Sequence, residues 1–203
     1  MMMRGAAHFP KAPPPASRGG IRTFARGAAL WLLSALPAAA QGTAPLADIL
    51  LPPLEMSEAG IYCPADHVAK EDAPDTESGY ILLTEENPEM VLSSRVVPAY
   101  IGISFGIRIR LEPGAPLEPY VFTVHHPPVG PRQVTTESWN PALDSRWGVR
   151  SFNFEFDREL VTGTWTFEVS RDDVVLLRQS FEVVPPMQAP EAIDICFGNT
   201  FVS

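Results

Sequence analysis

The sequence predicts an all-β fold, a two-sheet antiparallel sandwich of immunoglobulin-like type with seven or eight strands. Two observations support this prediction. Several short segments alternate apolar and polar residues, which is typical of strands with one buried face. Turns rich in proline and glycine separate these segments, and no stretch has convincing amphipathic helix periodicity. A closed barrel is the structural alternative.

The clearest hairpin lies near the end of the chain. Trp165, Phe167 and Val169 occupy one side of a period-two pattern that begins at a glycine. The polar turn 170–173 follows, and a second apolar run ends at Val183. Because its neighbours on the same face are apolar, Trp165 is predicted to be a core residue.

A long strand is predicted for residues 101–111, where isoleucine, phenylalanine or leucine occupies every odd position. Serine, arginine and glycine occupy the even positions, so one face is buried and the other is not. Gly102 and Gly106 on the outer face indicate a bulge or the close approach of another backbone.

The remaining predicted strands are shorter and end at turn residues. They cover residues 58–63, 80–83, 91–97, 120–125, 133–139 and 150–157. The region 66–89 is acidic and contains prolines, so it is predicted to be an exposed excursion that only strand 80–83 interrupts.

The first 40 residues resemble a cleavable export signal. Basic residues precede an apolar run over 28–36, which is shorter than the roughly 20 residues that cross a bilayer. Cleavage before Gln41 predicts a periplasmic or secreted protein with no membrane association after signal removal. The predicted organisation is a signal peptide over 1–40, a flexible leader over 41–56, a β-sandwich domain over 57–184 and a C-terminal tail over 185–203.

The mature chain is strongly acidic. The full sequence has a formal charge of −9, and removal of residues 1–40 takes away five basic and no acidic residues, which leaves −14. Such a surface repels phosphate backbones and anionic lipids, so neither nucleic acid nor a membrane is an expected partner. The sequence leaves the partner unidentified, with a periplasmic protein as the candidate.

The two cysteines, Cys63 and Cys196, lie near opposite ends of the folded region. An even number of cysteines in an oxidising compartment favours a disulfide between them. Such a bridge ties the tail to the first strand. Two independent thiols are the alternative.

No catalytic constellation is recognisable, and the sequence has no serine elbow of the kind Gly-x-Ser-x-Gly. The protein is therefore predicted not to be an enzyme and to need no cofactor. His67, His125 and His126 are the candidate ligands of a less favoured metal site. Trp139 and Trp147 are the candidate stacking residues of a carbohydrate-binding module, the alternative function.

Several short motifs occur in a fixed order and together resemble a bacterial family, the domain of unknown function numbered 3859, over roughly residues 57–184. The resemblance implies the fold and no known activity. The favoured interpretation is an exported, non-catalytic binding or accessory module. The motifs are Gly60-Ile61-Tyr62, Phe105-Gly106-Ile107, His126-Pro127-Pro128, Phe156-Asp157 with Glu159-Leu160, Gly163-Thr164-Trp165-Thr166-Phe167 and Phe181-Glu182-Val183.

Overall fold

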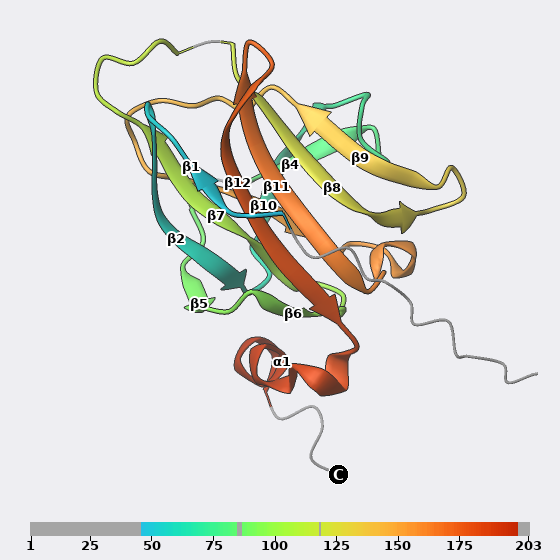
Figure 1. Ribbon diagram of the computed structural model, residues 1–203. Coiled ribbons are helices and arrows are strands. Elements are labelled where there is room, and N and C mark those ends of the chain that lie inside the picture. Colours follow the sequence, from blue (N-terminus) through green and yellow to red (C-terminus); the bar gives the residue numbers. More distant parts are fainter. Residues whose placement is uncertain (1–45, 85–86, 118, 199–203) are drawn as a thin grey trace, which may run out of the picture. The chain divides into compact units, whose positions relative to one another are not determined.

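The computed structural model describes residues 46–84, 87–117 and 119–198. These residues form a β-sandwich with an added hairpin and a short C-terminal helix (Figure 1). The predicted signal peptide, residues 1–40, lies outside the described residues, as does the beginning of the predicted leader.

Six strands form the larger sheet of the sandwich, called sheet A. They are β1 (Ile49–Leu50), β6 (Val96–Pro98), β8 (Val121–Val129), β9 (Val134–Trp139), β11 (Gly163–Arg171) and β12 (Val174–Val184). Their order is β1-β12-β11-β8-β9, and β6 pairs with the end of β12. All pairs are antiparallel except β6 with β12. The hairpin predicted near the end of the chain is therefore the β11–β12 pair inside this sheet.

Four antiparallel strands form the second sheet, called sheet B. They are β2 (Leu54–Tyr62), β5 (Met90–Leu92), β7 (Ser104–Leu111) and β10 (Gly148–Asn153). Their order is β10-β7-β2-β5, so the predicted long strand, β7, lies inside the sheet and β10 lies at its edge. The predicted two-sheet sandwich is confirmed.

Sheets A and B enclose an aromatic core with Phe105 of β7 at its centre. Its ring lies 5.3 to 5.6 Å, between centroids, from the rings of Phe154, Trp165, Phe167 and Phe181. None of these five side chains is more than 1% exposed. Large buried aromatic side chains dominate the energetics of a core of this kind. The prediction that Trp165 is a core residue is confirmed.

The structure corrects three predicted strands. The strand expected over 150–157 ends at Asn153. The single strand expected over 91–97 is two strands, because the chain leaves sheet B after β5 and joins sheet A at β6. The strand expected over 101–111 begins only at Ser104, because Gly102 lies in a turn with a φ of 86°. Gly106 does mark a close approach, since a Cβ atom there would lie 2.1 Å from the carbonyl oxygen of Arg150.

Both ends of the domain extend beyond the predicted limits. Part of the predicted leader is ordered, since β1 pairs with β12 and β2 begins at the buried Leu54 rather than near residue 57. The predicted tail contains a 3-10 helix, η2 (Pro186–Gln188), and a helix, α1 (Pro190–Phe197). Within the described ranges, no helix is long and apolar enough to span a membrane.

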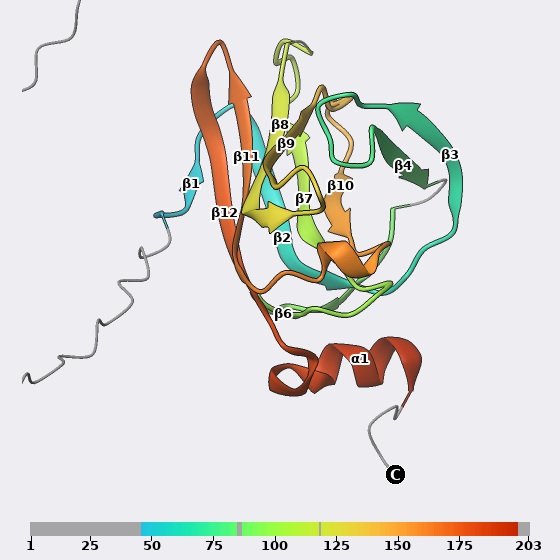
Figure 2. The ribbon, with the colours of Figure 1, turned by 90° about the vertical axis from the view of Figure 1, so that its right-hand side faces the viewer.

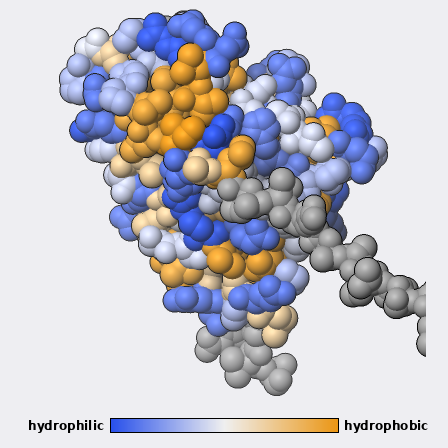
Figure 3. Space-filling view, viewed as in Figure 1, coloured by the Kyte–Doolittle hydropathy of each residue, from blue (hydrophilic) through white to orange (hydrophobic). Residues whose placement is uncertain are grey.

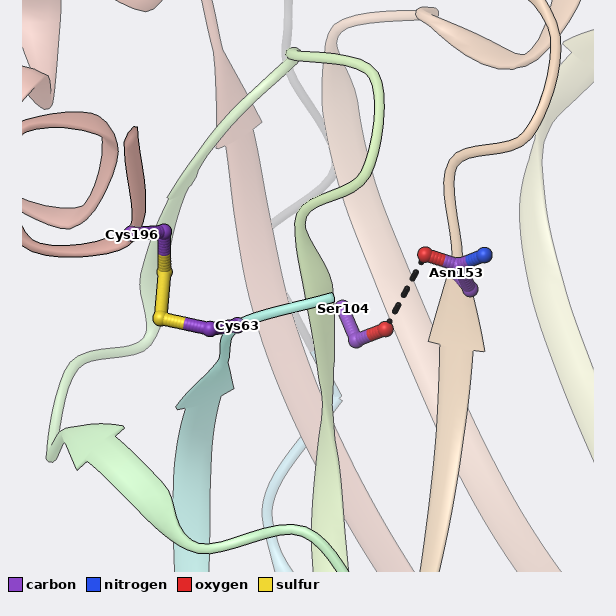
Figure 4. The surroundings of a disulfide bond; sticks show 4 residues. All are labelled: Cys63, Ser104, Asn153 and Cys196. Carbon is purple, nitrogen blue, oxygen red and sulfur yellow. Dashed lines mark hydrogen bonds between the residues drawn. A yellow bond between two sulfur atoms is a disulfide. The ribbon is translucent and has the colours of Figure 1, made fainter. Parts of the chain in front are cut away.

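The disulfide between Cys63 and Cys196 is formed, with an S–S distance of 2.06 Å. It joins the residue after β2 to helix α1 (Figure 4). In the same region, Ser104 of β7 donates a hydrogen bond to Asn153 of β10. The predicted pairing is confirmed, and the bridge holds the C-terminal helix against the sandwich.

The remaining two strands, β3 (His67–Asp72) and β4 (Tyr80–Thr84), form an antiparallel hairpin of their own. Neither strand pairs with sheet A or sheet B. The hairpin lies beside the edge of sheet B, with β4 between β3 and β10 (Figure 2). This region was predicted to be an exposed excursion with one short strand, and β3 is the element that the prediction missed.

The molecular surface mixes polar and apolar residues on the face that Figure 3 shows. An apolar area lies over β1 and the adjoining part of β12. The exposed apolar side chains of these strands include Leu50 and Val174, which are 44% and 55% exposed.

Candidate functional site

The three histidines considered as metal ligands lie in different environments. His125 is on the outer face of sheet A, where its Nε2 lies 3.4 Å from a carboxylate oxygen of Glu168. The side chain of His126 points into the core and is fully buried. His67 is exposed on the β3–β4 hairpin. Among the described residues, no group of three or more histidine, cysteine or acidic side chains is arranged to hold a metal ion.

The two tryptophans considered for carbohydrate binding line different cavities. Trp139 packs against Phe122 with 4.8 Å between ring centroids. The ring of Trp147 is covered by the guanidinium of Arg110, which lies 4.4 Å from its centroid. Both indoles are half-buried, and each already has a protein group against it.

A cleft lies between the β3–β4 hairpin and the sandwich. Its volume is about 330 Å³, which falls at the lower end of the range for ligand pockets. One wall is β4, and the opposite wall is β10 together with the end of β9. Trp139 and Phe152 contribute apolar surface, while carboxylates and backbone groups contribute polar surface. We refer to this feature as the hairpin cleft.

Two strands, β4 and β10, line the hairpin cleft with their backbone edges. Each of the five residues of β4 lines the cleft, and so does every residue of β10 from Val149 to Asn153. Successive side chains of a strand point to opposite faces, so a cavity over one face contacts only alternate residues. Contact with every residue places the cavity beside the strand, where unpaired backbone groups are presented.

The turn of the β3–β4 hairpin is attached to the sandwich by polar contacts. The N–H of Glu77 donates to Oε2 of Glu137 on β9, 3.0 Å away. Arg132 donates to the carbonyl oxygens of Thr76 and Glu77, at 3.1 and 2.6 Å. Arg158 forms an ion pair with the carboxylate of Glu77 at 2.8 Å. These contacts close one end of the cleft.

Glu137 lies beside a buried histidine. Nδ1 of His126 donates to the carbonyl oxygen of Pro127 at 2.8 Å, because that oxygen can only accept. Nε2 of His126 lies 3.2 Å from Oε1 of Glu137. The imidazole also stacks on Trp165, with 4.6 Å between ring centroids. The carboxylate that accepts the N–H of Glu77 thus lies next to the aromatic core.

At the other end of the cleft, Asn87 bridges to the edge of β10. Its side-chain oxygen accepts from the N–H of Val149 at 3.0 Å, and its side-chain nitrogen donates to the carbonyl oxygen of Trp147 at 3.2 Å. The guanidinium of Arg150 donates to the carbonyl oxygens of Val149 and Ala142, at 2.8 and 2.5 Å. Burial lowers the pKa of Arg150.

Glu159 is a buried acidic group in the cleft lining. It belongs to the short 3-10 helix η1 (Asp157–Glu159). Its Oε2 accepts hydrogen bonds from the N–H groups of Glu155 and Phe156, at 2.7 and 3.0 Å. Burial raises the pKa of Glu159, although these hydrogen bonds act in the opposite direction. The cleft therefore has a polar floor built from this turn.

Sequence reasoning missed most of these residues. Glu137, Asn87 and Arg150 occur in no recognisable motif, and only the fold brings them to one cleft. The one available signal was the apolar run 80–83 within an acidic region, because an isolated strand needs a partner. Of the predicted candidates, Trp139, His67 and Cys63 line the cleft.

The comparisons with known proteins concern the fold alone. The profile of a family described as "Domain of unknown function (DUF3859)" matches residues 51–183. No curated protein matches the sequence. Among solved structures, an immunoglobulin-like protein from Pseudomonas aeruginosa is similar, with 21% sequence identity and a TM-score of 0.46. The match covers 70% of this chain and 100% of that chain.

Proposed function

The chain belongs to the DUF3859 family, whose description names no activity, and we propose that it is an exported, non-catalytic module that binds its partner in the hairpin cleft. The observation that carries this proposal is the position of the cleft at the edges of two strands, β4 and β10. Unpaired strand edges are established binding elements in proteins.

Export is supported by two features. Residues 1–40 have the basic start, the apolar run and the small residues of a cleavable signal. The bridge between Cys63 and Cys196 is typical of proteins that fold in an oxidising compartment. The periplasm is the proposed location.

Mass spectrometry of the protein secreted from the full-length precursor is expected to find Gln41 at its N-terminus, and retention of residues 1–40 contradicts export.

A binding role without chemistry is supported by how the polar side chains of the cleft are used. The carboxylate of Glu137 accepts a hydrogen bond from the hairpin turn, and the guanidinium of Arg150 donates to the carbonyl oxygens of Val149 and Ala142 on the sandwich side. The carboxylate of Glu159 accepts hydrogen bonds from the turn beneath it. These groups maintain the shape of the cleft, and the proposed partner is a periplasmic protein.

Binding in the cleft is tested with a substitution that fills it. Ser151 lines the cleft, so Ser151→Trp is expected to abolish capture of the partner from a periplasmic extract. Thr123→Trp is the matched control, because Thr123 is half-buried on the outer face of sheet A. Both variants are first checked by circular dichroism for the unchanged fold. Equal capture by the wild type and both variants, or no capture by the wild type, contradicts the proposal.

A further inference from the structure

We propose that the hairpin cleft is a slot for one extended peptide strand of a partner protein, which pairs with β4 on one side and with β10 on the other. The inserted strand joins the β3–β4 hairpin to sheet B as a continuous sheet. This proposal rests on the proposed function, in that it takes the hairpin cleft to be the binding site and specifies the partner that it accepts.

The free edge of β10 presents an open pair of backbone groups at Ser151. In a strand, the N–H and C=O groups of one residue point to the same side, and those of the next residue to the other side. The N–H and C=O of Phe154 both bond to the chain around Ile103, at 3.1 and 2.8 Å, so the even residues face β7. The N–H of Val149 bonds instead to Asn87. The N–H and C=O of Ser151 therefore face the cleft.

The edge of β4 presents a matching pair at Leu82. Gly79 bonds to Ala73 across the hairpin, so the odd residues of this segment face β3. The carbonyl oxygen of Tyr80 accepts from the hydroxyl of Ser78 rather than from β3. The N–H and C=O of Leu82 consequently point away from β3. Leu82 and Ser151 both line the same cavity.

One end of the slot is already filled by side chains that act in place of a strand. Asn87 supplies one acceptor and one donor to the start of the β10 edge. The guanidinium of Arg150 supplies a donor to the next carbonyl oxygen, that of Val149. Within the described part of the chain, this substitution stops before Ser151. The open part of the β10 edge therefore runs from Ser151 to Asn153 and matches about three residues of extended chain.

The side chains around the slot select apolar and basic residues. Trp139 and Phe152 are half-buried and provide apolar contact surface. Glu71 and Glu155 also line the cleft, and within the described ranges neither has an ion-pair partner. Unpaired carboxylates at a binding edge favour lysine or arginine on the partner. The partner segment is therefore an extended peptide that carries both apolar and basic side chains.

The experiment uses a capped octapeptide in which lysine and valine alternate, added to the mature protein secreted from the full-length precursor. Calorimetry is expected to show saturable binding. Hydrogen exchange is expected to slow at least about tenfold at the amides of Leu82 and Ser151, because each amide gains a hydrogen bond. An octapeptide of alternating glutamate and valine is expected not to bind, because the carboxylates of the cleft repel it.

Backbone pairing is separated from side-chain contact by a third peptide. Methylation of every second backbone nitrogen of the lysine and valine peptide removes the donors from one edge and leaves the side chains unchanged. Its binding is expected to be at least about tenfold weaker, since it cannot pair with both walls.

Two variants of the protein test the same backbone pairing. Ser151→Pro removes the open N–H donor and keeps the hydrogen bonds to β7 intact, whereas Ser151→Ala keeps the donor. Only the proline variant is expected to weaken binding.

Strand addition and the proposed function fail in different ways. Equal binding of the methylated and unmethylated peptides, or no added protection at Leu82 and Ser151, overturns strand addition. If Ser151→Trp nevertheless abolishes capture from the periplasmic extract, the cleft remains the binding site for a ligand of another kind. Capture by Ser151→Trp at the level of the wild type overturns the proposed function itself.

Discussion

The β-sandwich and the β3–β4 hairpin are held in place by opposite kinds of interaction. In β7, Phe105, Ile107 and Ile109 are at most 1% exposed and pack into the core. In β3, all six residues from His67 to Asp72 are exposed. The hairpin is attached by hydrogen bonds and ion pairs, chiefly around Glu77. The stability of the fold is therefore concentrated in the sandwich.

The weaker attachment of the hairpin suits its proposed role in binding. Elements that open or move on binding come from the regions of low local stability. A strand inserted between β4 and β10 gives the hairpin the sheet neighbour that it lacks. Binding is thus expected to stabilise the hairpin far more than the sandwich.

Trp165→Ala is expected to lower the free energy of unfolding by about 3–5 kcal/mol, because it leaves a large cavity in the aromatic core. The indole is fully buried, and its Nε1 donates to the carbonyl oxygen of Val161 at 3.1 Å. Denaturant unfolding followed by circular dichroism measures the loss. Trp147→Ala is the control, since this half-buried ring lies outside the core and is expected to cost clearly less. Equal losses of unfolding free energy in the two variants contradict the conclusion that stability is concentrated in the sandwich.

Removal of the disulfide is expected to cost about 2–4 kcal/mol, because the bridge closes a long loop, with a sequence separation of 133. The double variant Cys63→Ala with Cys196→Ala tests this in denaturant unfolding without reductant. The wild type in reducing conditions is the control and is expected to match the double variant. Cys63 lies where the chain leaves sheet B toward the hairpin, so the loss affects both regions. An unchanged unfolding midpoint contradicts a stabilising bridge.

The sequence predicted the sandwich well because its strands follow strict period-two patterns. The face made by Trp165, Phe167 and Val169 is buried as expected, and all three side chains are fully buried. The prediction failed where burial does not alternate. Strand β3 has no buried face, so nothing in its pattern separates it from an acidic loop. Phe156 lies outside β10 and is 36% exposed, because the chain turns into a 3-10 helix there.

The hairpin cleft was beyond sequence reasoning for a different reason. Its walls are backbone edges, and the N–H and C=O groups at Leu82 and Ser151 are the same in every residue type except proline. Which of them remain unpaired depends on strand order and register, which are properties of the whole fold. Helix α1 was missed because it is only eight residues long, and it is stabilised by docking of Ala192 and Ile193 and by the disulfide.

Arg132→Ala is expected to loosen the hairpin and to change global stability by less than about 1 kcal/mol, because the side chain is exposed and, among the described residues, bonds only to the hairpin turn. Hydrogen exchange is expected to become several-fold faster in β3 and β4 and to remain unchanged in β7 and β11. Arg178→Ala is the matched control, because Arg178 pairs with Glu168 on sheet A. Faster exchange throughout the sandwich contradicts the independence of the two regions.

Glu159→Gln is expected to give the smallest effect, visible as a change with pH. Burial raises the pKa of this carboxyl in the folded protein above its unfolded value of about 4.3, so the folded state binds the proton more tightly. The stabilisation from this group is complete below that unfolded value and is lost as the pH rises through the folded pKa. Glutamine remains neutral and still accepts the bonds from Glu155 and Phe156.

The stability of the glutamine variant relative to the wild type is therefore expected to increase between pH 4 and pH 7. Denaturant unfolding of both proteins across this range measures the difference, and Glu112→Gln is the control for loss of an exposed carboxylate. A difference that falls as the pH rises contradicts a carboxylate destabilised by burial. In that case the hydrogen bonds at Glu159 outweigh its desolvation, and the floor of the cleft contributes to stability as the sandwich core does.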